Sequence, residues 1–517
     1  MNPLANRVRF WQSANFRETM VCFAVITSLF MWIISGRIDS GDATSQAKAA
    51  MILVAHARLS APDRAPDNLW IASRSGRFYQ YHDLGNVLLM SLPAWVGKKA
   101  WAYNYDDFLF DRPPRQVRAL MAITVALTAA VGITFFFRAM RRFFQSRQAI
   151  GLALMLALGT FFLPYVKTGF DVVACAVAVM GLIWTVSVAL SGPTTTITMA
   201  AAIGFFLGLI GTFRYSVAPF VGLSVIALVI LRRDRFAIPA VLALAIGTAA
   251  TLVPMFIYNY VRMGNPLIPA TASPAFKHTN ALATPMTTGL YGLLMSPNRG
   301  VIWFAPVIAL SPFGLWKPFR VDPTLRQITN CLLLGAIGYL CVVSKLIAWD
   351  GSMGWGPRYV VPVLPILFLA SIGPLLWLCE HRRNIAAIFI IACVTISTVP
   401  AMVDWVQISI NDNRATHGGA RMPYQQIAVW RALIYRCLGY SSDPHLAPGG
   451  IVNIPDGILL RTVFGATTTR ARIAAGASLA FLALVIGYGI WILSRSNTAP
   501  DSPVVLELGR HSAVNRC

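Results

Sequence analysis

The distribution of apolar residues constrains this chain most, because long apolar runs alternate with polar connections along most of its length. Of 517 residues, 56% are hydrophobic and 12% are charged, and the mean hydropathy is +0.62. A transmembrane helix needs about 20 predominantly apolar residues. We therefore predict an all-α polytopic membrane protein with about 12 transmembrane helices. The predicted spans are 18–36, 118–138, 150–165, 172–190, 197–213, 216–231, 237–259, 300–316, 328–346, 359–379, 385–403 and 471–494.

Positive residues, which give the chain a formal net charge of +23, gather in alternate connections between these spans. Because Lys and Arg accumulate in short cytoplasmic loops, these connections and the N-terminus are predicted to be cytoplasmic. Topology then explains the charge, and no nucleic-acid partner is expected. The N-terminal apolar stretch has no clear cleavage site and is predicted to remain as the first span. The Lys and Arg residues of the connections predicted to be cytoplasmic are Arg138, Arg141, Arg142, Arg147, Arg232, Arg233, Arg235, Lys317, Arg320, Arg326, Arg382 and Arg383.

Loop lengths divide the chain into four parts. Residues 1–403 form the transmembrane core and include a long first outer loop, 37–117. Two weakly amphipathic patterns in that loop, 43–60 and 84–100, predict helices that lie in the membrane interface. Residues 404–470 form a small extracytoplasmic loop or cap, 471–494 form the last transmembrane helix, and 495–517 form a cytoplasmic tail.

The connection Trp349–Tyr359 combines residue types suited to a binding site. Its glycines allow a close backbone approach or a positive φ, while Asp350, Trp355 and Arg358 add a carboxylate, a stacking surface and a cationic donor. The alternative is an interfacial turn, in which the aromatic side chains lie at headgroup depth and the arginine reaches out to water. Both interpretations place this loop at the outer membrane edge.

Two carboxylates, Asp39 and Asp42, directly follow the first span. A partly desolvated carboxylate beside Arg37 is suited to act as a general base on a hydroxyl group. The alternative is that both residues only cap the helix that begins near Ala43. The spacing alone does not decide between these two roles.

A second part of the first outer loop, residues 76–86, carries aromatic side chains with a His-Asp pair. Tyr81 and His82 are candidates for a saccharide pocket, because aromatic faces and polar groups together hold sugars. Asp83 could instead cap the following helix, with His82 exposed. No ligand spacing typical of a metal site is present, although a bound divalent metal stays open.

Arginines at the outer ends of spans run against the positive-inside rule, which makes an anionic ligand attractive. Arg214 lies in a tight hairpin between two spans, and Arg299 and Arg358 each precede a span. Guanidinium groups bind phosphate in a bidentate manner. The alternative for Arg214 is that it reaches the interface, and Lys167, in a short outer turn with Asp171, could form a local ion pair.

In their order, these segments resemble the bacterial GT-C membrane glycosyltransferases, which are related to protein O-mannosyltransferases and aminoarabinose transferases. The resemblance extends over residues 18–380 and implies a multi-span enzyme that uses a polyprenyl-phosphate sugar at the outer membrane face. It also implies that Asp42 acts on the acceptor. The chain departs from the O-mannosyltransferases, whose acidic residues are adjacent, and 404–470 is shorter than the outer domains of several relatives. The segments are Gly41-Asp42, Tyr79-Gln80-Tyr81 with Gly85 and Pro93, Gly159-Thr160 with Pro164-Tyr165, Arg214, Ser296–Gly300 and Trp355–Tyr359.

The sequence therefore predicts an inverting glycosyltransferase of the bacterial inner membrane, with its active site outside. It would move a sugar from a polyprenyl-phosphate donor to a hydroxyl group of an envelope glycan, lipid or protein. Asp42 is the predicted base with Asp39 in support, and Arg214 and Arg358 hold the phosphate, with Arg299 and Lys167 in reserve. A transporter or flippase for a lipid-linked or anionic solute is the alternative, although the spans are nearly free of charge. A non-catalytic assembly partner is a third possibility.

Overall fold

The structure is a computed structural model. It describes residues 3–38, 40–61, 64–73, 75–270, 282–316, 319, 321–351, 354–402, 429–430, 434 and 469–495. Asp39, most of the predicted cap 404–470 and the tail beyond Arg495 lie outside the described residues.

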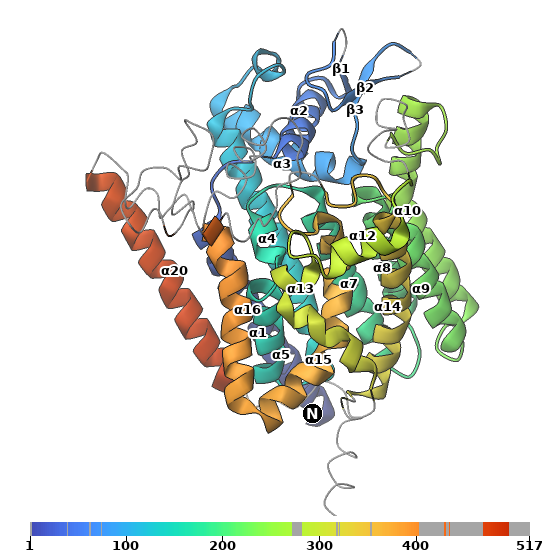
Figure 1. The fold of residues 1–517 in the computed structure, drawn as a ribbon, viewed down its shortest axis with the longest axis vertical. Helices are drawn as coiled ribbons and strands as arrows, with labels where there is room; N and C mark the ends of the chain where they lie inside the picture. Colours follow the sequence, from blue (N-terminus) through green and yellow to red (C-terminus); the bar gives the residue numbers. More distant parts are fainter. Residues whose placement is uncertain are drawn as a thin grey trace, which may run out of the picture.

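An apolar helix is present at each of the twelve predicted spans, so the predicted all-α membrane fold is confirmed. In the described part of the chain, eight spans are long and apolar enough to cross a membrane. They are α1 (Pro3–Ile33), α4 (Arg115–Met140), α7 (Asp171–Ser191), α10 (Ile238–Met263), α14 (Pro323–Ser344), α15 (Leu364–His381) preceded by the 3-10 helix η6 (Arg358–Val363), α16 (Arg383–Met402) and α20 (Thr469–Arg495) (Figure 1).

The other four predicted spans correspond to shorter helices, which are α5 (Ser146–Leu158), α8 (Ile197–Phe213), α9 (Ala218–Leu231) and the 3-10 helix η4 (Pro306–Leu315). The span predicted as a continuous helix over 300–316 is broken. A four-residue helix, α13 (Val301–Phe304), ends before Pro306, and η4 follows it. Proline lacks the backbone N–H and clashes with the preceding turn, so a regular α-helix does not continue through Pro306 and Pro312.

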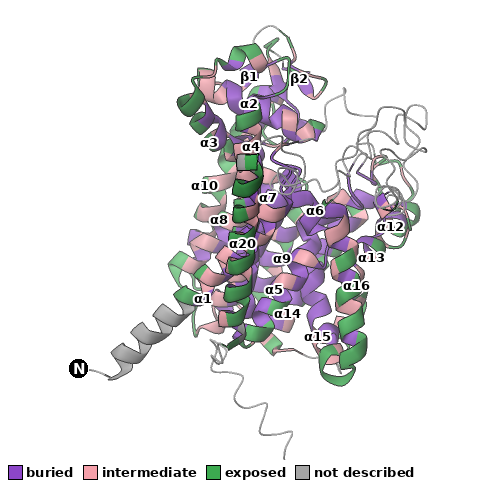
Figure 2. Cartoon of the chain, turned by 90° about the vertical axis from the view of Figure 1, so that its left-hand side faces the viewer, coloured by how far each residue is buried: buried purple, intermediate pink, exposed green. Residues whose placement is uncertain are grey.

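Helix α7 forms the centre of the bundle. It is apolar on all sides, 89% of its span is buried, and it packs against α4 and α8. By contrast, only 11% of the span in α20 is buried; this helix lies at the left edge of the bundle in Figure 1 and is mostly exposed in Figure 2. A helix that is hydrophobic all round belongs in a core. The first residue of α7, Asp171, is therefore a charged group at the end of one of the two most buried spans.

Close packing fixes the position of α8 against α10. Gly204 on α8 and Gly247 on α10 face the backbone of the opposite helix, and a Cβ at Gly204 would come within 1.9 Å of the Leu244 carbonyl oxygen. Small residues allow transmembrane helices to approach in this way. The packing places Arg214, which ends α8, near the outer end of α10.

The first outer loop forms a layer above one end of the bundle (Figure 1). The two helices predicted there are present as α2 (Gly41–His56) and α3 (Leu84–Trp101). Between them lies a small antiparallel sheet, in the order β1 (Ser60–Ala61), β3 (Phe78–Gln80), β2 (Trp70–Ala72), with Ser60 opposite Tyr79 and Trp70 opposite Gln80. These strands have two or three residues, too few to produce the alternating pattern that predicts a strand.

Short helices complete the described connections at this end. The 3-10 helix η1 (Tyr105–Phe108) precedes α4, α6 (Phe162–Val166) lies between α5 and α7, and α12 (Met286–Leu294) lies in the predicted outer loop before Arg299. A Cβ at Gly292 of α12 would overlap the ring of Trp349, so α12 lies directly against the loop that begins there.

Candidate active site

The candidate site lies where residues 37–117, predicted as the first outer loop, meet the start of α7, the end of α8 and η6. Hydrogen bonds join these parts: the Ser40 hydroxyl donates to the Thr168 carbonyl oxygen (3.4 Å), and the Asn86 amide donates to the Gly169 carbonyl oxygen (3.0 Å). All four of these residues are buried or nearly so. The start of α2 is thus held against the turn that leads into α7.

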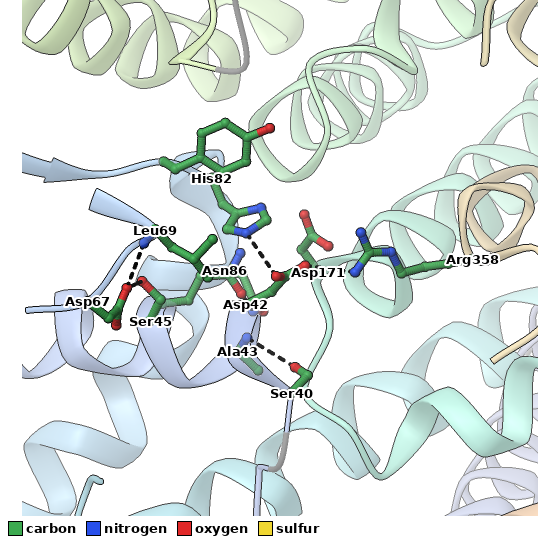
Figure 3. A network of polar contacts seen from close by, with 12 residues as sticks. Ser40, Asp42, Ala43, Ser45, Asp67, Leu69, His82, Asn86, Asp171 and Arg358 are labelled. Carbon is green, nitrogen blue, oxygen red and sulfur yellow. Dashed lines mark hydrogen bonds and ion pairs between the residues drawn. The ribbon is translucent and has the colours of Figure 1, made fainter. Parts of the chain in front are cut away.

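Ser40 caps helix α2, because its hydroxyl accepts the Ala43 N–H at 3.1 Å. Asp42 therefore lies in the first turn, where the helix dipole favours a negative charge, and its carboxylate is available for other contacts. Ser45 lies about one turn further along α2, and its hydroxyl donates a hydrogen bond to the Asp67 carboxylate (3.2 Å). Asp67 also accepts the Leu69 N–H (3.0 Å). These contacts anchor α2 to the segment before β2 (Figure 3).

The Asp42 carboxylate lies between the Arg358 guanidinium and the His82 imidazole (Figure 3). Its Oδ2 is 2.8 Å from Nη1 of Arg358, and its Oδ1 is 3.5 Å from Nε2 of His82. Only 18% of the Asp42 side chain is exposed. Asp42, His82 and Arg358, which belong to three separate segments of the sequence, therefore meet at one point.

Electrostatics keep Asp42 ionised. Burial alone would raise the pKa of its carboxyl, but the positive charges of His82 and Arg358 outweigh burial and hold the pKa well below its ordinary value. A carboxylate of this kind is a strong hydrogen-bond acceptor but a weak base for as long as Arg358 contacts it.

A second ion pair lies beside the first. Nη2 of Arg214 is 3.2 Å from Oδ1 of Asp171, and both side chains are at least 90% buried. The guanidinium carbons of Arg214 and Arg358 each lie 5.3 Å from the centre of the Tyr359 ring. The two arginines predicted to hold phosphate thus share an aromatic neighbour. Asp171 was not predicted as a site residue. The available signal was a charged residue at the start of a strongly apolar span.

The segment that carries Tyr81 and His82 is held by Arg262, near the end of α10. Its Nη1 donates to the carbonyl oxygens of Gln80 (3.0 Å), Tyr81 (3.2 Å) and His82 (2.7 Å), and its side chain is fully buried. The Tyr81 ring packs edge-on against the His82 ring, with centroids 5.0 Å apart. Arg262 therefore fixes the backbone from which the His82 side chain reaches Asp42. The sequence contained no signal for this role, since Arg262 follows a predicted span outside the recognised segments.

Asp83 connects the segment that carries Tyr81 and His82 to the turn after Arg214. It occupies the N-cap position of α3, but its carboxylate makes no cap hydrogen bond within the helix. Instead its Oδ2 accepts the Tyr215 N–H at 2.9 Å, and its Oδ1 lies 3.7 Å from Arg262. Burial raises the pKa of Asp83, while the charge of Arg262 opposes this shift. The alternative in which Asp83 only caps α3 through its side chain therefore does not hold.

The loop from Trp349 to Arg358 is shaped by its glycines and by Arg299. Gly351 and Gly356 have φ of +73° and +55°, so the glycine-rich composition has a backbone reason. Arg299 Nη1 donates to the Gly354 carbonyl oxygen and, at 3.4 Å, to that of Gly356. Through these contacts Arg299 stabilises the conformation of the loop. Substrate binding by Arg299 stays a prediction.

Trp355 faces the protein interior. Its side chain is 1% exposed, its ring packs edge-on against Phe304 with centroids 5.2 Å apart, and its carbonyl oxygen accepts the Tyr165 hydroxyl at 2.7 Å. In the described conformation this tryptophan offers little stacking surface to a ligand. Asp350 and Lys167 are also buried, at 5% and 3% exposure.

The described residues contain no group of three His, Cys, Asp or Glu side chains arranged to hold a metal ion. The side chains that meet at the site are two carboxylates, an imidazole, two guanidinium groups and the Tyr359 ring. Such an arrangement can bind an anion and accept a proton from a neighbouring hydroxyl group.

Comparisons with known proteins return solved structures only. The chain is similar to ArnT from Cupriavidus metallidurans bound to undecaprenyl phosphate, with 15% identity, a TM-score of 0.47, and coverage of 94% of this chain and 77% of that one. It is also similar to the Archaeoglobus fulgidus oligosaccharyltransferase tethered to an acceptor peptide, with 12% identity, a TM-score of 0.38, and coverage of 91% and 71%. No family model and no curated protein matches.

Both matches have identities below 25% and TM-scores below 0.5. At these identities and TM-scores, the chemistry of this chain has to be read from its own residues.

Proposed function

We propose that this multi-pass membrane protein is a glycosyltransferase that moves a sugar from a polyprenyl-phosphate donor to a hydroxyl acceptor. The observation that carries the proposal is the position of Asp42 between His82 and Arg358, beside the Asp171–Arg214 pair. A transfer of this kind needs a proton acceptor and a stabiliser for a leaving phosphate within reach of each other. The two ion pairs bring both to one place.

In the proposed reaction the acceptor oxygen attacks the anomeric carbon of the sugar from the side opposite the phosphate. The new C–O bond forms as the bond from the anomeric carbon to the phosphate oxygen breaks, and the configuration inverts. The leaving oxygen takes the bonding electron pair and becomes polyprenyl phosphate, while the acceptor proton passes to Asp42. Arg358 and Arg214 stabilise the charge that develops on the phosphate.

Donor binding would also prepare the base. A phosphate that attracts the Arg358 guanidinium weakens the Asp42–Arg358 contact, and the loss of that positive charge moves the pKa of Asp42 upward, toward the range of a useful base. His82 remains beside the carboxylate and orients it. The proposed order is therefore donor first and proton transfer second.

The proposed location is the bacterial inner membrane, with a cytoplasmic N-terminus and an extracytoplasmic site. The support is the positive-inside rule applied to the arginine-rich connections at the opposite ends of the helices. The arginines at the site end have compensating groups, since Arg214 and Arg358 pair with carboxylates and Arg299 binds carbonyl oxygens. The acceptor would be an envelope glycan, lipid or protein.

The test is sugar transfer by purified protein in liposomes that contain a polyprenyl-phosphate sugar and a mixture of extracted envelope acceptors. We expect labelled sugar to appear on an acceptor, with stoichiometric release of polyprenyl phosphate. Movement of the donor across the bilayer without cleavage would instead identify a flippase, and would overturn the proposal.

A further inference from the structure

A cavity of about 850 Å³ lies between α5, α15 and α16, away from the candidate active site. Its position follows from the direction of the helices. Helix α15 follows η6, which begins with Arg358 at the site, and it contains 18 residues, so its far end is roughly 27 Å further along the bundle. The cavity includes Glu380 at that far end. Figure 1 shows α5 and α15 in the lower part of the bundle, opposite the first outer loop.

The cavity is apolar along its length and charged at its far end. Helix α5 contributes a stripe of residues one turn apart, Gly151, Met155 and Leu158, and this stripe forms one face of the helix. At the start of the same helix the lining includes Arg147, and at the end of α15 it includes Glu380. Both of these charged side chains are exposed.

The dimensions match one leaflet of a bilayer. Helix α5 has 13 residues and rises roughly 20 Å from Arg147 at its start to its C-terminal end. Half the thickness of a bilayer, including the headgroup region, is about 20–22 Å. A lipid whose headgroup lies at the charged end would therefore place an acyl chain along the apolar stripe.

The charges select the headgroup. Arg147 supplies a donor for a phosphate, and Glu380 supplies a carboxylate for a cation next to it. A zwitterionic lipid with a primary ammonium group carries both complements in the required order, since the phosphate is nearer the chains and the ammonium group is terminal. We propose that this groove is a binding site for phosphatidylethanolamine of the leaflet opposite the active site.

Gly151 provides a selective way to fill the groove. A Cβ built at Gly151 meets no atom within 4 Å and Gly151 lines the cavity, so a large side chain there should extend into the groove. Gly476 on α20 also has no atom within 4 Å of its Cβ, and it does not line the groove. Gly151→Phe and Gly476→Phe are thus a matched pair, both of which replace a helical glycine in open space.

The experiment is native mass spectrometry of the full-length protein in detergent, titrated separately with phosphatidylethanolamine, phosphatidylcholine and phosphatidylglycerol of equal chain length. We expect the wild type and Gly476→Phe to retain one phosphatidylethanolamine with about tenfold higher affinity than the other two lipids, and Gly151→Phe to lose this bound lipid. Glu380→Gln should abolish the preference over phosphatidylcholine. Arg147→Gln should weaken retention of all three lipids, because each carries a phosphate.

Equal retention by Gly151→Phe and Gly476→Phe would overturn the proposal, because the lipid would then lie elsewhere. A preference for phosphatidylglycerol over phosphatidylethanolamine would also contradict it and would point to a general anionic site. Retention that appears only after deletion of residues 496–517 would mean that the chain itself fills the groove in the intact protein, and would also overturn the proposal.

Discussion

Asp42 and Arg358 are 316 residues apart in the chain, and their side chains form an ion pair of 2.8 Å. One lies in the first turn of α2 in the first outer loop, and the other begins the segment that leads into α15. The pair therefore connects the outer loop to the membrane core at the point where the acceptor and the donor phosphate would meet. It also makes the protonation state of the carboxylate depend on the position of the guanidinium.

This dependence predicts how stability varies with pH. An unperturbed Asp has a pKa of about 3.9, and in the folded protein the pKa of Asp42 is lower, so folding favours the ionised form. The stabilisation from this carboxylate is complete above about pH 4 and is lost as the pH falls further. We expect the difference in Tm between wild type and Asp42→Asn to be present at pH 5 and to shrink below pH 4, measured by thermal unfolding in detergent. A difference that disappears between pH 5 and 7 would mean that the pKa is raised.

Lysine at the two arginine positions should impair transfer. A lysine keeps the charge but loses the planar, bidentate donor group, and a hydrogen bond to a charged group contributes about 1.5–3 kcal/mol. Arg358→Lys and Arg214→Lys should each lower kcat/KM for the donor by about 10–100-fold. Arg112→Lys, an exposed position in the first outer loop, is the control and should resemble wild type. Near-normal kcat/KM in both site variants would exclude bidentate contact with the phosphate.

Variants of the buried Asp171–Arg214 pair should affect stability and activity differently. Removal of one partner from a buried ion pair leaves an uncompensated charge and typically costs about 3–5 kcal/mol. Asp171→Leu should therefore lower Tm strongly, and the double variant Asp171→Leu/Arg214→Leu should recover much of the loss while transfer remains absent. Recovery of transfer together with Tm would show that the pair has only a structural role.

Arg262 should act as a positioning residue through the backbone of residues 80–82. Arg262→Lys cannot donate to three carbonyl oxygens in the same geometry, so His82 should move relative to Asp42. We expect kcat to fall by about 10²-fold with little change in donor binding, because small displacements of reacting groups have effects of this size. A matching loss of donor binding and Tm would indicate general unfolding instead.

Topology can be tested with single cysteines in a cysteine-free background. Asp107 is exposed in the first outer loop, and Asp234, 64% exposed, lies in an arginine-rich connection. Asp107→Cys should react with a membrane-impermeant thiol reagent in intact cells, and Asp234→Cys should react only after permeabilisation. Ser45 would be a poor probe, since its side chain is buried and hydrogen-bonded to Asp67. The reverse labelling pattern would place the site on the cytoplasmic side.

Hydropathy predicted the helices well because bilayer thickness sets their length, and α8 was predicted with its observed bounds, Ile197–Phe213. The sheet β1–β3–β2 was missed because its strands are too short to show a period. Side-chain partners were harder to predict than helices: a phosphate was predicted beside Arg214, and the carboxylate that pairs with it in the structure, Asp171, is 43 residues away in the chain. The inward orientation of Trp355 depends on Phe304 and Tyr165, which come from other elements.

The most direct test of the account is the comparison of Asp42→Asn with Asp106→Asn in donor binding and sugar transfer. Both residues are carboxylates of the first outer loop that contact a histidine, but the Asp106–His56 pair is exposed and remote from Arg358. Asp42→Asn should fold and bind the polyprenyl-phosphate sugar while kcat falls by about 10²–10⁴-fold, the usual contribution of a general base, and Asp106→Asn should match wild type. Full transfer by Asp42→Asn, in protein that binds the donor normally, would remove this carboxylate from the mechanism.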